Sequence, residues 1–306
     1  MLSLHKLEIF STVVQAGSFS AAAERLYMTQ SAVSQHIHDL EARLGTPLFK
    51  RGRRGVTLTV AGEKLHTYTQ QILRLVAEAE RAVTTVENLT SGHLQIGATP
   101  GVSTYLLPEW LQSFQQRYPR LTIALATDIT ARVVADVLDY KLDIGFVEGE
   151  LTAVTDERLG QHVLCEFESF VVVGPNHPWW ERDQVPLAAL DGERFITRPP
   201  NSQTGIWLSQ LLSENRVQPQ IVGAFDNQET IKAAVIAGTG ITILPGYAIA
   251  LEQQRGLIRA LSISDYALRR SLKLIWERRT PLTPIAAAFL RDLAESFPDL
   301  DSSIPV

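Results

Sequence analysis

Residues 59–89 form a long stretch of regular apolar spacing, and this stretch most constrains how the chain can fold. From Thr59 to Leu89 the sequence contains no proline, and its only glycine is Gly62. Apolar or small side chains recur there in steps of three and four residues, which is the heptad pattern of a helix that packs against another helix. The positions of this seam are Leu65, Tyr68, Ile72, Leu75, Ala79, Ala82, Val86 and Leu89. The pattern predicts two folded parts joined by one long helix.

The partner of this helix is open to two interpretations. The helix lies either along the surface of its own domain or against a second copy of itself. We favour a homodimer, because a long amphipathic helix between two domains has little else to bury against. The small side chains of Ala79 and Ala82 would let two such helices approach closely.

The first 58 residues predict a small helical domain. Apolar spacing indicates a helix over residues 4–16 and a short Ala-rich helix after it. Thr29 is the expected N-cap of a third helix, which Gly45 closes. The predicted buried face of this third helix consists of Val33, Ile37, Leu40 and Leu44.

The opposite face of the third helix is polar and is followed by a cluster of cations. Its outward residues are Gln30, Ser31, Ser34, Gln35 and His38, and the cations are Lys50, Arg51, Arg53 and Arg54. On an isolated helix such a face is most simply a solvated surface. Here three short helices precede a basic, glycine-containing hairpin, which predicts a helix-turn-helix with a wing. Its polar helix suits base edges in the major groove, and its cations suit the phosphate backbone.

The distribution of charge agrees with a polyanionic partner for the first domain alone. The whole chain has a net charge of −5. Residues 1–91 hold 10 Lys and Arg against 8 Asp and Glu, which gives +2, whereas residues 92–306 hold 18 against 25, which gives −7. A basic front on an acidic body is typical of a domain that binds nucleic acid.

The run AAERLYMTQSAVSQHIHDLEARLGTPLFKR, residues 22–51, together with LTVAG at residues 58–62, resembles the N-terminal domain of LysR-type transcriptional regulators. The resemblance implies that Thr29, Gln30, Ser31, Ser34 and Gln35 lie on the recognition helix. It implies that Arg51, Arg53 and Arg54 serve the phosphate backbone of promoter DNA. In this family the linker helix pairs protomers, often into tetramers, and RNA polymerase is a further candidate partner.

The C-terminal two hundred residues alternate between strand and helix patterns. HLQIGAT, LTIALAT and DIGFVEG predict strands, and helical segments separate them. This alternation indicates βαβ units and a parallel sheet. The segment resembles the effector-binding domain of the same family, which has two α/β subdomains like a periplasmic binding protein of type II. The motif GTGITILP at residues 238–245 carries part of that resemblance.

The expected fold class is α/β, with a winged helix-turn-helix, a linker helix and a two-subdomain effector domain. The expected domains are residues 1–58 for DNA binding, 59–90 for the linker and 91–306 for the effector domain. Subdomain I takes residues 91–161 and 267–306, and subdomain II takes 162–266. The chain would cross between subdomains near residues 159–163 and 262–267.

Ligands in such a fold lie beyond the carboxyl ends of the strands, near helix N-termini. Hydroxyl groups at these positions favour a small anion, although each Ser or Thr taken singly is most simply a helix cap. The candidate effector residues are Thr99, Pro100, Ser103, Thr130, Arg198, Ser202, Thr204 and Asn227. The expected ligand is a small anionic metabolite of unknown identity, with no cofactor.

One loop departs from the family pattern. Residues 198–205 read RPPNSQTG, where many relatives read REPGSGTR. A glutamate, two glycines and the final arginine are absent, so we do not transfer a phosphate-like or sulfur-compound effector from those relatives.

No segment predicts catalysis, a metal site or a membrane span. Cys165 is the only cysteine, which excludes intrachain disulfides and fits a cytoplasmic protein. Its apolar neighbours predict a buried structural thiol. His36 and His38 are two residues apart and diverge on a helix, so a zinc site is not expected. Glu148 and Glu150 lack a third group that would make them an acid and base pair. The competing interpretation is a solute-binding or enzymatic α/β protein whose first domain is a scaffold.

Overall fold

The computed structural model describes residues 3–52, 55–84, 92–151, 156–265 and 267–300. The chain divides into two compact units, residues 1–88 and residues 89–306. Each unit is described by itself below.

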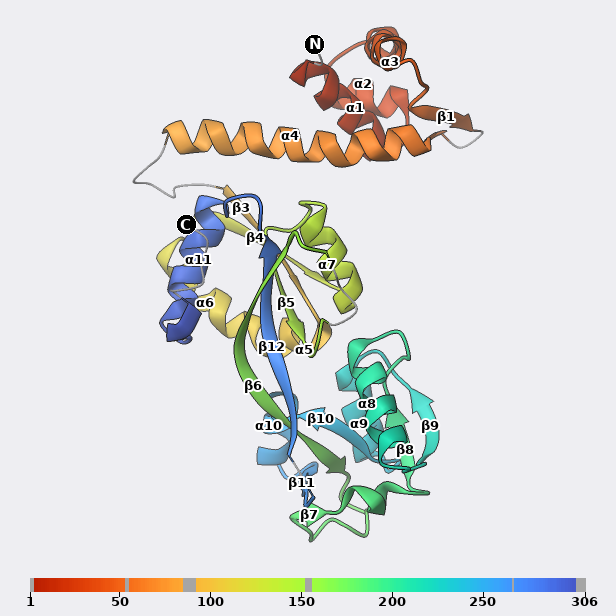
Figure 1. Ribbon diagram of the computed structural model, residues 1–306, viewed down its shortest axis with the longest axis vertical. Helices are drawn as coiled ribbons and strands as arrows, with labels where there is room; N and C mark the ends of the chain where they lie inside the picture. Colours follow the sequence, from red (N-terminus) through yellow and green to blue (C-terminus); the bar gives the residue numbers. More distant parts are fainter. Residues whose placement is uncertain (1–2, 53–54, 85–91, 152–155, 266, 301–306) are drawn as a thin grey trace. The chain divides into compact units, whose positions relative to one another are not determined.

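The first unit is a helical bundle with a small hairpin and a long final helix (Figure 1). Its elements are α1 (Leu4–Ala16), α2 (Phe19–Arg25), α3 (Gln30–Leu44), β1 (Phe49–Gly52), β2 (Gly55–Leu58) and α4 (Val60–Thr84). Their core joins Phe10 of α1, Ile37 of α3 and Leu48 before the hairpin, all of which are buried. β1 and β2 pair antiparallel, with Gly52 opposite Gly55.

Local sequence explains the limits of α3. The Thr29 hydroxyl accepts a hydrogen bond from the Ala32 amide at 3.2 Å, which is the expected N-cap. Gly45 ends the helix with a φ of 66°, a left-handed conformation that favours glycine. Val33, Ile37 and Leu40 are buried as predicted. The prediction for Leu44 was wrong, because this last helical residue reaches past the core and keeps 39% of its surface exposed.

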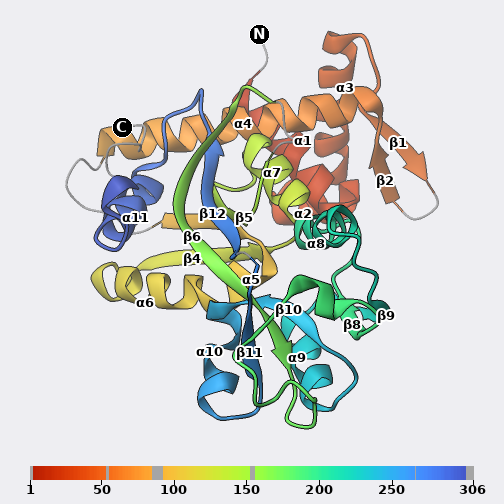
Figure 2. The ribbon, with the colours of Figure 1, turned by 60° about the horizontal axis from the view of Figure 1, so that its bottom comes forward.

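The second unit contains two lobes built on one mixed sheet (Figures 1 and 2). Lobe I contains β3 (Gly92–Ala98), α5 (Pro100–Tyr105), α6 (Leu107–Arg117), β4 (Leu121–Thr127), α7 (Thr130–Leu138), β5 (Ile144–Glu148), α11 (Pro284–Ala294) and η2 (Pro298–Leu300). Lobe II contains β7 (Gln184–Val185), η1 (Leu187–Leu190), β8 (Arg194–Thr197), α8 (Gln203–Glu214), β9 (Gln220–Ala224), α9 (Gln228–Ile236), β10 (Thr242–Pro245), α10 (Gly246–Gln254) and β11 (Arg259–Ile263).

Two long strands connect the lobes. β6 (Leu159–Val173) and β12 (Leu268–Glu277) pair antiparallel from Leu159 opposite Glu277 to Ser169 opposite Leu268. At one end β12 pairs with β5 of lobe I, and at the other β6 pairs with β10 and β11 of lobe II. Figures 1 and 2 both show the two strands running side by side between the lobes. The sheet order is β4-β3-β5-β12-β6-β11-β7, with β10 on β6, and β8 and β9 of lobe II form a separate two-stranded sheet.

The prediction of βαβ units and a parallel sheet is confirmed for part of the second unit, and it does not extend to the strands that connect the lobes. β3 pairs parallel with β4 and β5, and β8 with β9, because helices connect the strands that follow one another in the chain: α5 and α6 join β3 to β4, α7 joins β4 to β5, and α8 joins β8 to β9. The strands that connect the lobes are antiparallel. Their partners are far apart in sequence, so no local pattern reports their direction.

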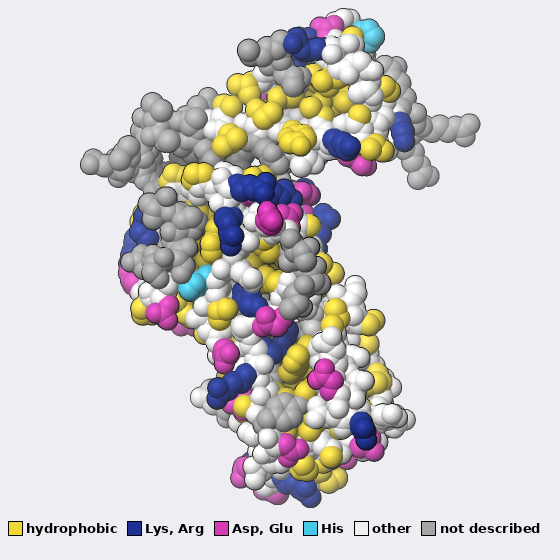
Figure 3. Space-filling model, in the orientation of Figure 1, with side chains coloured by type: hydrophobic (Ala, Val, Ile, Leu, Met, Phe, Trp, Pro, Cys, Tyr) yellow, Lys and Arg dark blue, Asp and Glu magenta, His cyan; other side chains and the backbone are white. Residues whose placement is uncertain are grey.

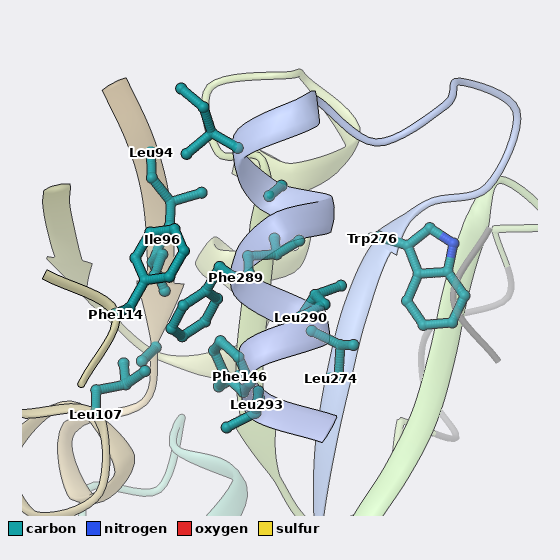
Figure 4. Close-up of a cluster of buried hydrophobic side chains, with 14 of the residues drawn as sticks. Leu94, Ile96, Leu107, Phe114, Phe146, Leu274, Trp276, Phe289, Leu290 and Leu293 are labelled. Carbon is teal, nitrogen blue, oxygen red and sulfur yellow. The ribbon is translucent and has the colours of Figure 1, made fainter. Parts of the chain in front are cut away.

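Alternating side chains of the strands form a core on each face of lobe I. Leu94 and Ile96 of β3 pack with Phe146 of β5 and Phe289 of α11 on one face (Figure 4). On the other face Ile275 of β12 packs against α7. This two-residue period is the reason that one strand can carry helices on both sides.

Candidate functional site

The outward face of α3 is polar and borders a hollow on the surface of the first unit. Gln30, Ser31, Gln35 and His38 are exposed, and Ser34 is half-buried. A hollow of about 410 Å³ lies along this face. Its lining contains every residue that we predict for the recognition helix except Thr29. The helix therefore presents its polar side chains to the outside together.

One carboxylate ties this polar face to the rest of the unit. Asp39 accepts hydrogen bonds from Lys6 Nζ at 3.0 Å and from Gln35 Nε2 at 2.8 Å. The hydrogen bond from Lys6, followed by that from Gln35, lowers the pKa of Asp39. The contact joins α1 to α3 and restrains the Gln35 side chain at the rim of the hollow.

A glutamate side chain of α3 holds the start of the hairpin by accepting hydrogen bonds from its backbone amides. Glu41 Oε1 accepts from the amides of Leu48 at 2.7 Å and Phe49 at 3.3 Å. Lys50 is exposed on β1. Arg53 and Arg54 lie outside the described residues, and the side chain of Arg51 is not described either.

The linker seam divides into a packed part and an open part. Leu65 packs against the core of its own unit, as the alternative interpretation of the long helix expects. Tyr68 and Leu75, seven residues apart, keep 62% and 53% of their surfaces exposed, and Ile72 is half-buried. Figure 3 shows hydrophobic atoms on the surface of the described part of α4. The side chains of Ala79 and Ala82, and all of Val86 and Leu89, lie outside the described residues.

A cavity of about 330 Å³ lies between the two lobes of the second unit. Its lining includes six of the eight residues that we predict for the effector: Thr99, Pro100, Thr130, Arg198, Ser202 and Thr204. The first residues of α7 and α8 are part of the wall. The cavity therefore lies beside helix N-termini, as the fold class leads one to expect.

Two predicted residues lie outside the lining of this cavity. The Ser103 hydroxyl is 2.6 Å from the Thr127 hydroxyl. Asn227 is exposed and caps α9, where its Oδ1 accepts from the Glu229 amide at 2.8 Å. Ser202 lines the cavity but also caps α8, because its hydroxyl accepts from the Gly205 amide and donates to the Pro199 carbonyl. A role for any of the eight in binding an effector stays a prediction.

Arg198 is the most unusual group in the cavity wall. Only 7% of its surface is exposed, and neither Nε nor Nη1 has a hydrogen-bond partner among the described residues. Burial lowers the pKa of its guanidinium, whereas the nearby Glu148 carboxylate acts in the opposite direction. A buried guanidinium with free N–H groups is costly unless an acceptor reaches it.

Sequence reasoning missed the groups that surround Arg198. Glu148 ends β5 with 5% of its surface exposed and lines the cavity. Arg270 of β12 is equally buried, donates from Nη1 to the Thr204 hydroxyl at 2.9 Å, and lies over the Trp207 ring at 5.1 Å. Burial raises the pKa of the Glu148 carboxyl, while Arg270 and Arg198 oppose that shift. The sequence signal that could have identified Glu148 is its position as a charged residue directly after the apolar strand segment IGFV.

Two tyrosines connect the lobes beside the cavity. Tyr247 of α10 donates a hydrogen bond to Glu148 of β5. A Cβ atom at Gly101 would lie 2.8 Å from the Tyr247 hydroxyl and 3.1 Å from Glu148 Oε1, so any larger residue there would displace the Tyr247 hydroxyl. Tyr105 of α5 donates to Glu229 of α9 at 2.6 Å. Each of these contacts would change if the lobes moved apart.

A buried lysine lies beside the contact between Tyr105 and Glu229. Lys232 is 3% exposed and pairs with Glu229 at 3.0 Å and Glu252 at 2.7 Å. Its Nζ also lies 4.9 Å from the centre of the Tyr105 ring. Burial, together with the hydrogen bond to Glu229, raises the pKa of Tyr105, which therefore stays a donor.

The described part of the chain also bears on the expectations for the cysteine, for a metal site and for a membrane span. Cys165 is half-buried rather than fully buried, and burial raises the pKa of its thiol. Among the described residues no group of three or more His, Cys, Asp or Glu side chains could hold a metal ion. None of the described helices combines the length and the apolarity that crossing a bilayer needs.

Comparison with known families identifies the chain. Residues 4–63 match the family described as "Bacterial regulatory helix-turn-helix protein, lysR family", and residues 87–298 match "LysR substrate binding domain". A "Probable RuBisCO transcriptional regulator" of Nostoc sp. (strain PCC 7120 / SAG 25.82 / UTEX 2576) is 32% identical over 307 residues, covering 99% of this chain and 91% of that protein. The chain belongs to the LysR family. It is a DNA-binding transcriptional regulator with an effector-binding domain, and not an enzyme.

Solved structures of LysR proteins share the fold. The full-length protein CbnR, in complex with its target DNA, has a TM-score of 0.70 at 20% identity, and the match covers 96% of this chain and 100% of that one. The regulatory domain of CcmR from Synechocystis PCC6803, in complex with 2-PG, has a TM-score of 0.62 at 22% identity, covering 67% of this chain and 97% of that one. At these identities the likeness establishes the fold alone.

The tyrosine contact between the lobes yields a first prediction. Tyr105→Phe removes the hydrogen bond to Glu229 and leaves the ring in place. Since a hydrogen bond to a charged group contributes about 1.5–3 kcal/mol, we expect lower stability of the second unit and faster amide exchange in α5 and α9. Tyr118→Phe, which removes a hydroxyl elsewhere in lobe I, is the control. Equal exchange in both variants would show that the Tyr105 contact does not hold the lobes.

Proposed function

We propose that this LysR regulator binds promoter DNA as a homodimer, or as a tetramer of two such dimers, and senses a small anionic metabolite in the cavity between its lobes. The single observation that carries the sensing role is Arg198, a buried guanidinium in the cavity wall whose Nε and Nη1 have no hydrogen-bond partner among the described residues. Because its partner is promoter DNA, the protein works in the cytoplasm.

The geometry of the cavity supports a mechanism. Lobe I supplies Thr99, Thr130 and Glu148, and lobe II supplies Arg198 and Thr204. An anion that touches both sides favours one spacing of the lobes. A ligand shifts such an equilibrium only by its difference in affinity for the two states. The structure of CcmR with 2-PG supports a ligand in this domain, since that relative binds one there.

For DNA, we assign base contacts to the polar face of α3 and backbone contacts to the hairpin. The former set is Thr29, Gln30, Ser31, Ser34, Gln35 and His38, and the latter is Lys50, Arg51, Arg53 and Arg54. Paired protomers predict a pseudo-palindromic site with half-sites about one helical turn apart. The Nostoc relative makes promoters of RuBisCO genes the first natural targets to try.

The sensing role predicts a ligand that needs negative charge. We expect small carboxylates to raise the melting temperature of the full chain, and their amides, such as propionamide in place of propionate, to have no effect. An acid present at 100 times its dissociation constant adds about 2.7 kcal/mol. Arg198→Gln removes the effect, whereas Arg194→Gln, at an exposed arginine of β8, retains it. Equal stabilisation by acids and amides would exclude an anion site.

The two DNA contact sets predict different defects. Lys50→Ala removes a phosphate contact, so the slope of log affinity against log salt should fall by about one per protomer, for every DNA sequence. Gln35→Ala should instead reduce the preference for a site selected from a random library over a shuffled site. Fluorescence anisotropy across a salt series measures both, with Arg255→Ala as the control. An unchanged salt slope for Lys50→Ala would remove the hairpin from the interface.

The exposed part of the α4 seam predicts the oligomeric state. Tyr68→Asp combined with Leu75→Asp places charges at two positions of the expected helix pair, so the dimer should dissociate to the 33.9 kDa protomer. Val60→Asp changes an equally exposed residue off the seam and should leave the dimer intact. Sedimentation velocity distinguishes the two masses. A double variant that stays dimeric would place the interface elsewhere.

A further inference from the structure

The cavity wall carries a negative acceptor as well as free donors. Neither Nε nor Nη1 of Arg198 has a hydrogen-bond partner among the described residues, and the same holds for the Thr130 hydroxyl, on a residue that is 2% exposed. Glu148 stands in the same wall. Its carboxylate can only accept hydrogen bonds while it is ionised. A ligand that fits both sides must bring an acceptor to Arg198 and a donor to Glu148.

The negative charge of Glu148 disfavours a ligand that is a simple anion without hydrogen-bond donors. A carboxylate, sulfate or phosphate without donors would place negative oxygens beside a second buried negative group, which costs free energy. Tyr247 donates to one oxygen of Glu148, and Arg270, Arg198 and the Thr99 hydroxyl stabilise its charge, yet a carboxylate has about four acceptor sites. The cavity therefore keeps an acceptor that an unsubstituted acid cannot use.

The balance of buried charge distinguishes the two common donors, a hydroxyl and an ammonium group. Arg198 and Arg270 are each 7% exposed and face one buried carboxylate, Glu148. The other nearby carboxylates, Asp226 and Glu150, are exposed and screened by solvent, and Glu150 is already paired with Lys273 at 2.7 Å. This leaves one buried positive charge in excess. A hydroxy acid with a single negative charge neutralises it, whereas the zwitterion of an amino acid does not.

We propose that the effector is a small hydroxy acid, with its acid group on Arg198 and its hydroxyl donating to Glu148. Glu148 is then the residue that determines specificity. This inference rests on the anion-sensing role proposed above and narrows its ligand class. A cavity of 330 Å³ holds about ten non-hydrogen atoms, at roughly 30 Å³ for each water-sized group. That size matches an acid of three to six carbons.

Three acids with one carbon skeleton test the proposal in the unchanged full-length protein. Propionate has no donor, lactate carries a hydroxyl, and alanine carries an ammonium group at the same carbon. Glycerate adds a second hydroxyl. In isothermal titration we expect lactate and glycerate to bind at least ten-fold more tightly than propionate or alanine. Propionate binding as tightly as lactate would overturn the hydroxy acid while leaving the anion site intact.

Two variants attribute the preference to particular residues. Glu148→Gln keeps the size of the side chain and an acceptor for Tyr247 but removes the charge, so lactate and propionate should bind within about three-fold of each other. Arg198→Gln should weaken all the acids together. Glu181→Gln, at an exposed carboxylate of lobe II, is the matched control and should keep the ten-fold preference.

Each of the remaining outcomes would contradict a particular part of the proposal. Tighter binding of alanine than of lactate would replace the hydroxy acid by an amino acid. A preference that survives Glu148→Gln would remove Glu148 from the site. Failure of every acid to bind the unchanged protein would overturn both this inference and the anion-sensing role. The comparison among acids needs no variant, so it holds even where Glu148→Gln does not fold.

Discussion

The antiparallel pairing of β6 with β12 is the constraint on which the second unit depends. One strand leaves lobe I and the other returns to it; β12 pairs with β5 of lobe I, and β6 pairs with β10 and β11 of lobe II. This ladder brings Glu148 of β5 beside Arg270 of β12, more than a hundred residues later in the sequence, and sets both opposite Arg198. The cavity is therefore a consequence of strand register, and a slip of one residue would turn Arg270 to the opposite face.

The buried guanidinium in the cavity wall carries a free-energy cost, which a ligand with a suitable acceptor would lower. Buried charges are stable only when they are paired and hydrogen-bonded, and Arg198 is 7% exposed with Nε and Nη1 unpartnered among the described residues. An acid that satisfies them gains more than it would from the same contact in water. Because the wall comes from both lobes and the hydroxyl groups of Tyr105 and Tyr247 bridge them, this gain is available only at particular lobe spacings. In the mechanism proposed above, a local charge contact is thereby converted into a change in lobe spacing.

Features set by neighbouring residues were predictable from the sequence, and features set by distant pairing were not. The Thr29 cap, the Gly45 terminus and the polar face of α3 follow from helix periodicity. Thr99, Thr130 and Arg198 line the cavity because each follows a strand of a βαβ unit or lies in the loop before a helix. Glu148 and Arg270 meet only through β5 and β12. Leu44, at a helix end, shows that periodicity alone does not report how far the core extends.

The central claim is that occupancy of the cavity alters DNA binding, and the coupling between the two ligands tests it most directly. The measurement is the affinity of the full-length protein for its selected DNA site, with and without a saturating concentration of the acid that binds most tightly. We predict a change of at least five-fold, a typical coupling of about 1 kcal/mol or more, which Arg198→Gln abolishes. Tight binding of the acid with no change in DNA affinity, site length or bend would contradict the account.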